Sequence, residues 1–192
     1  KNTILSESQS IARLADYIDE NFFEATQKIY NSKGRLVVTG IGKSAIIAQK
    51  MVASFNSTGT PSLFLHASEA IHGDLGMIQS EDVIICISKS GNSPEIKVLV
   101  PLLKRFGNTL IAITGNMTSF LAQGSDIVLN TTVDSEACPN NLAPTNSTTA
   151  QLVMGDALIV CLMEMRDFKP EDFAVYHPGG ALGKKLLLRV KD

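Results

Sequence analysis

Cysteine is scarce in this sequence, and the three cysteines that occur are scattered. Cys86, Cys138 and Cys161 lie far apart, without the close spacing typical of metal sites. Cys86 and Cys161 stand inside apolar segments, where a free thiol most simply serves as a small core residue. This usage indicates a reduced compartment, and we expect the protein to be cytoplasmic.

An excess of charge of one sign is also lacking. The 17 Lys and Arg residues nearly balance the 19 Asp and Glu residues, which gives a net charge of −2 and a pI near 5.9. A nucleic-acid-binding or membrane-surface protein would show a basic footprint. No apolar run reaches the roughly 18 residues that a spanning helix needs, and no secretory signal opens the sequence. We therefore expect neither nucleic acid nor a membrane as a partner.

What the sequence does contain is a regular alternation of short apolar segments and helix-like segments, with a hydrophobic content of 44% that is ample for one domain. The apolar segments read as strands buried on both faces of a parallel sheet. Their rhythm predicts one α/β domain, a doubly wound, mainly five-stranded parallel sheet flanked by helices. Strands are expected at residues 35–39, 62–65, 83–87, 109–114 and 127–131, and helices at residues 6–30 (one or two helices), 45–58, 94–106, 119–123 and 147–166.

A serine-rich loop, SKSGNS at residues 88–93, follows the third predicted strand directly. Ser88, Ser90 and Ser93 supply hydroxyl groups, and Gly91 lets the backbone approach a ligand closely. Pro94 suits the first turn of a helix, whose free N–H groups and positive dipole end would face the loop. The loop therefore predicts a site for a phosphate monoester. A simpler interpretation, in which Ser93 only caps the helix, stays open at this point.

Two further loops have partial signatures. GIGKS at residues 40–44 follows the first strand, but it has neither the spacing of a nucleotide-binding phosphate loop nor the third glycine of a dinucleotide-binding fingerprint. The hydroxyl-rich segment at residues 143–149 opens the last helix. It admits the same two interpretations as the serine loop, a ligand site or a helix cap.

Several ionisable residues could carry chemistry or serve only structure. Glu95 stands in a first helical turn, where an acid favours the helix dipole, and Glu136 could be a solvated loop acid. His177 lies between a tyrosine and a Pro-Gly-Gly sequence, and a lone histidine is more often a structural hydrogen-bonding group than a catalyst. His66 and His72 are spaced poorly for zinc, so we expect capping and packing there and no metal site.

Taken together, five segments resemble the sugar isomerase (SIS) domain, and more narrowly the arabinose-5-phosphate isomerases of the KpsF/GutQ type. They cover most of the chain, and the second, fourth and fifth are highly specific. They are GIGKS at 40–44, FNSTGTPSLFLHASEAIHGDLGM at 55–77, SKSGNSPEI at 88–96, EACPNNLAPTNSTTAQLVMGDAL at 136–158 and DFAVYHPGGALGKKLLLRV at 172–190. Three departures stand out: Ala45 replaces a frequent glycine, Lys89 and Asn92 replace frequent Asn and Glu, and the two CBS modules of long members are not seen. We therefore expect a single SIS domain over residues 1–192.

The resemblance implies interconversion of D-ribulose 5-phosphate and D-arabinose 5-phosphate, which supplies Kdo for lipopolysaccharide or capsule synthesis. It implies no cofactor and no metal. The catalytic residues would be Lys43, Glu95, Glu136 and His177, and substrate or phosphate would be bound by Gly42, Ser44, Ser88, Ser90, Gly91, Ser93, Thr145 and Ser147.

For such an aldose–ketose isomerase, we expect Glu136 or Glu95 to be the base at carbon, His177 to move protons at oxygen or open the sugar ring, and Lys43 to stabilise charge. The competing hypothesis is a non-catalytic module that senses a phosphosugar or a sugar nucleotide. Apolar helices at residues 6–30 and 147–166 and the resemblance together predict a homo-oligomer. We expect a tetramer, or at least a dimer, with His177 donated to a neighbouring subunit's site.

Overall fold

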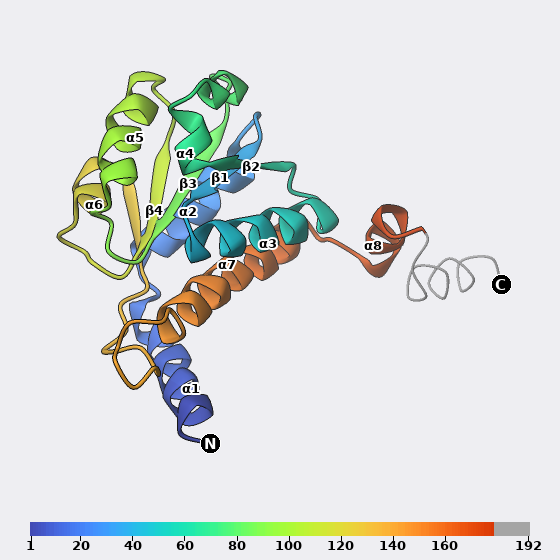
Figure 1. Cartoon of the computed structure of the whole chain (residues 1–192). Coiled ribbons are helices and arrows are strands. Elements are labelled where there is room, and N and C mark those ends of the chain that lie inside the picture. The colour runs from blue at the N-terminus through green and yellow to red at the C-terminus, as the bar shows by residue number, and fades with distance from the viewer. Residues whose placement is uncertain (179–192) are drawn as a thin grey trace.

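The computed structural model describes residues 1–178 and contains a five-stranded sheet in which all neighbouring strands are parallel (Figure 1). The strand order is β2-β1-β3-β4-β5. The prediction of a doubly wound α/β fold is confirmed. The strands are β1 (Leu36–Gly40), β2 (Ser62–His66), β3 (Val83–Ser88), β4 (Leu110–Thr114) and β5 (Ile127–Asn130).

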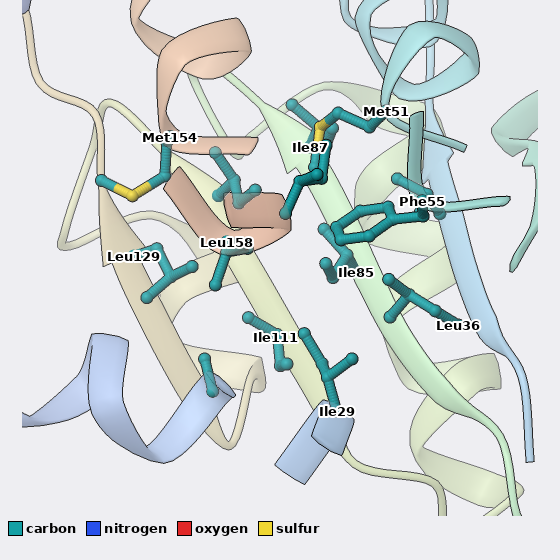
Figure 2. Close-up of a cluster of buried hydrophobic side chains, with 14 of the residues drawn as sticks. Ile29, Leu36, Met51, Phe55, Ile85, Ile87, Ile111, Leu129, Met154 and Leu158 are labelled. Atoms are coloured by element: carbon teal, nitrogen blue, oxygen red, sulfur yellow. The ribbon is translucent and has the colours of Figure 1, made fainter. Parts of the chain in front are cut away.

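The central strands are buried on both faces. Every residue of β1, β3 and β4 is buried, which explains why these segments are almost continuously apolar rather than alternating. One face carries a core built with α2, α3 and α7, and Figure 2 shows Phe55, Ile85 and Leu158 within it. The other face packs a second cluster that includes Ile84, Ile96 and residues of the short helices on that side.

Two helices form where one or two were predicted at the N-terminus. α1 (Asn2–Leu14) and a 3-10 turn lead to α2 (Glu20–Asn31), because Asp19 starts a new helix by accepting hydrogen bonds from the N–H groups of Asn21 and Phe22. α1 packs on α7 (Asn146–Met165) and extends beyond the sheet (Figure 1).

The remaining helices complete the two layers. α3 (Lys43–Ser57) packs on the same face as α7, and α5 (Pro94–Arg105) and α6 (Phe120–Gly124) pack on the other. Three short elements were not predicted: α4 (Ala67–Ala70), a 3-10 turn (Asp74–Met77) and α8 (Pro170–Tyr176). His66 caps α4 by accepting a hydrogen bond from the Ser68 N–H at 3.3 Å, which confirms the predicted capping role of this histidine.

α7 is long and apolar enough, by length and composition, to cross a membrane. Here it packs instead against α1, α2 and α3 within the domain. Gly155 makes the approach to α3 possible, because a Cβ atom at that position would lie 2.7 Å from Met51 Sδ. The helix therefore serves as a core element that packs closely on α3.

Candidate functional site

A polar pocket opens at the carboxyl ends of β1 and β3, which are neighbours in the sheet although β2 comes between them in sequence. The chain leaves these two strands toward helices on opposite faces of the sheet, and ligands of doubly wound folds bind at such a switch point. The pocket has a volume of about 270 Å³. It is lined by Ile41, Lys43, Ser44, Ser88, Lys89, Ser90, Ser93, Pro144, Ser147, Thr148 and Gln151.

Three helices begin at this pocket. Lys43 and Ser44 open α3, Ser93 caps α5, and Ser147 lies in the first turn of α7. The free N–H groups of a helix start carry a positive partial charge, so three such starts favour an anionic ligand at their meeting point.

The serine loop caps the helix and also retains donors for a ligand. Ser93 Oγ accepts a hydrogen bond from the Ile96 N–H at 3.5 Å, so it does cap α5. Ser88 Oγ accepts from the Gly91 N–H at 3.1 Å, and Ser90 Oγ accepts from the Asn92 N–H at 3.3 Å. A hydroxyl that accepts a backbone N–H still has its own hydrogen to donate. The capping and phosphate-binding interpretations are therefore compatible.

Gly91 gives this loop its shape, and Gly91→Ala should damage it. The glycine has φ of +62°, and a Cβ atom there would lie 2.2 Å from Oγ of the buried Ser119, which caps α6. Left-handed strain and the clash together should lower the free energy of unfolding by roughly 2–4 kcal/mol. Urea denaturation measures this loss, with Gly76→Ala as the control because the space around Gly76 is open. Equal midpoints for Gly91→Ala and wild type would show that the loop tolerates the change.

Glu136 is buried beside the pocket and accepts five hydrogen bonds. Oε1 accepts from Lys89 Nζ at 2.7 Å and from Ser147 Oγ. Oε2 accepts from the Thr145 N–H at 2.8 Å, from Thr145 Oγ1 at 3.1 Å and from the Ser147 N–H at 3.2 Å. The hydroxyls of Thr145 and Ser147, which we expected near the phosphate, thus have Glu136 as their partner.

These bonds hold Glu136 in its charged form. Burial by itself raises the pKa of the carboxyl group, but the hydrogen bonds from Lys89, Ser147 and the backbone outweigh it and lower the pKa from 4.5 to about 2. The stabilisation that this charge gives the folded protein is fully present above about pH 4.5 and is lost as the pH falls through the folded value.

Lys89 is the important residue that the sequence did not single out as functional. Its ammonium group pairs with Glu136, while its side chain remains 46% exposed and lines the pocket. Its carbonyl oxygen accepts hydrogen bonds from the Gly115 N–H and from Thr114 Oγ1 at the end of β4. The one available signal was its place inside the serine loop. Its contact with a loop 47 residues away depends on the tertiary fold.

The β1 loop contributes three of the expected residues. Gly42, with φ of +59°, is the N-cap of α3, so the helix begins two residues earlier than predicted. Lys43 is exposed and lines the pocket, where its ammonium group can face an anion. Ser44 Oγ donates to Gln151 Oε1 at 3.1 Å and thereby joins the starts of α3 and α7.

Glu95 and His177 do not line this pocket, and neither do Gly42, Gly91, Glu136 and Thr145. Glu95 is half-buried in the first turn of α5. His177 follows α8, beyond the far end of α7, and that helix of 20 residues is about 30 Å long (Figure 1). The His177 ring stacks on Phe173 at 3.8 Å between centroids, and its Nδ1 lies 2.9 Å from the Phe173 carbonyl oxygen. The last segment that carries the family resemblance runs to residue 190, and its part from residue 179 on lies outside the described residues.

A larger groove of about 460 Å³ lies at the amino ends of β3 and β4, and it has a different character. Its lining mixes both signs of charge, including Glu24, Lys28 and Glu81. Beside it, Asp82 accepts hydrogen bonds from Arg35 and Gln79, and Asn108 donates to nearby carbonyl groups. This end of the sheet is a structural network, and the pocket at the carboxyl ends is the better candidate site.

A metal centre has no obvious location in the part of the chain that the structure describes. No group of three or more His, Cys, Asp or Glu side chains is placed to hold an ion within residues 1–178. The donors around the pocket are hydroxyl, amide and ammonium groups, which suit an anion rather than a cation.

Comparison with known proteins agrees with this geometry. The chain is 55% identical over 192 residues to arabinose 5-phosphate isomerase KdsD of Shigella flexneri, and 50% identical over 192 residues to that of Pseudomonas aeruginosa. All of this chain matches, but it spans only 58% and 59% of the two proteins. Among solved structures, an Escherichia coli CFT073 protein in complex with arabinose 5-phosphate is 42% identical, with a TM-score of 0.89 and coverage of 92% of this chain and 94% of that chain.

A family-level match supports the same assignment. The SIS domain family matches residues 28–161, a range that includes all five strands, the serine loop and the first turns of α3, α5 and α7. The pocket-lining residues all fall inside this range. This chain belongs to the SIS domain family.

Proposed function

We propose that this chain carries the active site of an arabinose-5-phosphate isomerase, which interconverts D-ribulose 5-phosphate and D-arabinose 5-phosphate. The observation that carries the proposal is a pocket with an anion-binding serine loop on one side and the buried carboxylate of Glu136 beside it. A phosphosugar needs both features, one for its phosphate and one for its chemistry. The relatives named arabinose 5-phosphate isomerase and the solved relative bound to that sugar phosphate support this choice of substrate.

The reaction moves hydrogen between two adjacent carbons. A base removes the proton from C1 of the ketose, and the C1–H electrons form the double bond of a cis-enediol while the C2 carbonyl oxygen gains a proton. Return of a proton to C2, with loss of the proton from O1, completes the aldose. The protein must supply a base at carbon, a group that moves protons between O1 and O2, and positive groups near the developing oxyanion.

The pocket residues fit these roles. Ser88, Ser90, Ser93 and the start of α5 bind the phosphate, and Lys43 stabilises negative charge on the sugar oxygens. We propose Glu136 rather than Glu95 as the base at carbon. Neither carboxylate lines the pocket, but Glu136 accepts hydrogen bonds from two residues that do, Lys89 and Ser147.

We further propose a homo-oligomer, a tetramer, in which His177 of one subunit completes the site of another. Within one subunit, α7 separates His177 from the pocket by most of its length. Large apolar side chains that are exposed on the projecting α1 and on α7, such as Ile4 at 73% and Val160 at 54%, offer surface for association. We place the protein in the cytoplasm, where its product would enter Kdo synthesis.

The direct test is turnover of ribulose 5-phosphate, measured by NMR as the appearance of arabinose 5-phosphate. We expect equilibration of the two sugars without added metal or cofactor. A chain that binds either sugar phosphate but converts neither is a sensor module. Conversion of an aminosugar phosphate in preference to ribulose 5-phosphate would replace the proposed substrate.

A further inference from the structure

The carboxylate of Glu136 is not accessible from the pocket. Its side chain has no exposed surface, and it is absent from the pocket lining. Lys89 and Ser147 line the pocket and both donate to Glu136 Oε1, so they stand between this oxygen and the ligand. A base must come within hydrogen-bonding distance of the proton that it removes. Glu136 therefore has to be uncovered before it can act.

Of the two residues that shield Glu136 Oε1, Lys89 is the one whose side chain can move away. Its backbone is held at the end of β4 by two hydrogen bonds to its carbonyl oxygen, but nearly half of its flexible side chain is exposed. Ser147 has no such freedom, because it belongs to the first turn of α7 and its own N–H also bonds to Glu136. Lys89 can thus exchange its partner without disturbing the fold.

A bound phosphate offers Lys89 a competing partner. Lys89 lies between Ser88 and Ser90 in the sequence, and all three line the same pocket. A phosphate monoester carries close to two negative charges near neutral pH, whereas Glu136 carries one and already accepts four hydrogen bonds from Thr145 and Ser147. Once a phosphate has entered the loop, it therefore attracts the Lys89 ammonium group more strongly than the Glu136 carboxylate does.

We propose that Lys89 is a ligand-responsive counterion, which pairs with Glu136 while the serine loop is empty and turns to the phosphate when substrate binds, so that Glu136 is uncovered as a base only in the complex. The inference rests on the proposed isomerase function and deepens it. Glu136 would remain charged and covered in the free protein, and substrate phosphate would itself prepare the group that acts on the sugar. Lys89 is in this sense a positioning residue.

The other charged groups around Glu136 do not replace Lys89. Lys43 lines the same pocket from α3. Glu7 on α1 accepts a hydrogen bond from Thr149, and Asp134 pairs with Arg13. Among the residues that the structure describes, Lys89 forms the one ion pair with Glu136.

The test is a titration of the Glu136 carboxyl group by NMR in the full chain labelled with ¹³C at glutamate side chains, with and without inorganic phosphate. Glu136→Gln identifies the signal by removing it. In the wild type, we expect phosphate to raise the pKa of Glu136, because the ammonium group leaves as a negative charge arrives. In Lys89→Met, the pKa should already be raised without phosphate, and phosphate should add less than it does in the wild type.

Binding of inorganic phosphate gives the second measurement. Loss of a charge-assisted hydrogen bond should weaken the phosphate Kd of Lys89→Met roughly tenfold or more. Lys89→Arg should keep both phosphate binding and its effect on Glu136. Lys33→Met removes the same charge at the opposite end of the sheet and should change neither.

The proposal is overturned if phosphate leaves the titration of Glu136 unchanged in the wild type, or if Lys89→Met binds phosphate as the wild type does. If Lys89→Met does not fold, the titration of the wild type with and without phosphate still decides the question. None of these measurements requires turnover. A failed ribulose 5-phosphate assay with an intact link between phosphate and Glu136 would refute the proposed reaction but not the counterion.

Discussion

Replacing Glu136 by Gln should lower kcat for ribulose 5-phosphate by roughly 10²–10⁴-fold, the contribution expected of a general base. The amide has nearly the shape of the carboxylate, but it cannot take a proton from carbon. Substrate binding should suffer less than turnover, because the serine loop and the three helix starts remain. Steady-state kinetics should thus show a large fall in kcat and a small change in KM.

Two controls separate chemistry from folding in this experiment. Thermal unfolding at neutral pH shows whether Glu136→Gln remains folded. The stability that the wild type loses between about pH 4.5 and pH 2 should be smaller in the variant, since protonation of Glu136 contributes to that loss together with Asp82 and Asp126, whose pKa values are also lowered. Glu95→Gln is the matched variant. If it abolishes turnover while Glu136→Gln remains within about tenfold of the wild type, the base at carbon is Glu95.

Mixing two inactive variants should restore activity if the site is shared between subunits. His177→Ala and Glu136→Ala each destroy every site when alone. After random exchange of equal amounts, roughly a quarter of the sites would combine an intact His177 from one subunit with an intact Glu136 from another. Activity near that fraction of the wild-type level is the expected result, and His177→Ala alone should show almost none.

Subunit exchange must be confirmed independently, for example by mass spectrometry of hybrids in which one variant carries isotopic label. A mixture of His177→Ala with a second inactive variant of the same residue serves as the control, because no hybrid then has an intact histidine. Complete exchange without recovered activity would place His177 and Glu136 of one chain in the same site, whereas activity of His177→Ala alone would remove His177 from the mechanism.

The sequence predicted the layers of this fold well, because the short apolar runs that indicate strands are also the segments that the folded protein buries in its sheet. Leu36, Ile85 and Ile111 lie in short apolar runs, and all are buried in the sheet. The ends of helices and strands were predicted less accurately where a single capping residue sets the end. Gly42 caps α3 and brings Lys43 into the helix, and His66 extends β2 by one residue before it caps α4.

The candidate site was predictable as a set of loops but not as a set of contacts. The position of Ser88, Ser90 and Ser93 after a buried strand was enough to predict that this loop lies at the carboxyl edge of the sheet, because chain direction fixes where such a loop must lie. The partners of Glu136 were not predictable in this way. Thr145 and Ser147 were expected near phosphate, and Lys89 was noted only as a departure from the family pattern, since pairing across distant loops depends on packing.

The convergence of α3, α5 and α7 on one pocket has a consequence for how such proteins diverge. Much of the positive potential there belongs to the backbone at the helix starts, and a side-chain substitution cannot remove it. Mutation can therefore change Thr148 or Gln151, and with them the shape of the pocket, while attraction for an anion persists. Proteins that descend from this fold would therefore keep an anion-attracting pocket, whatever reaction they acquire or lose.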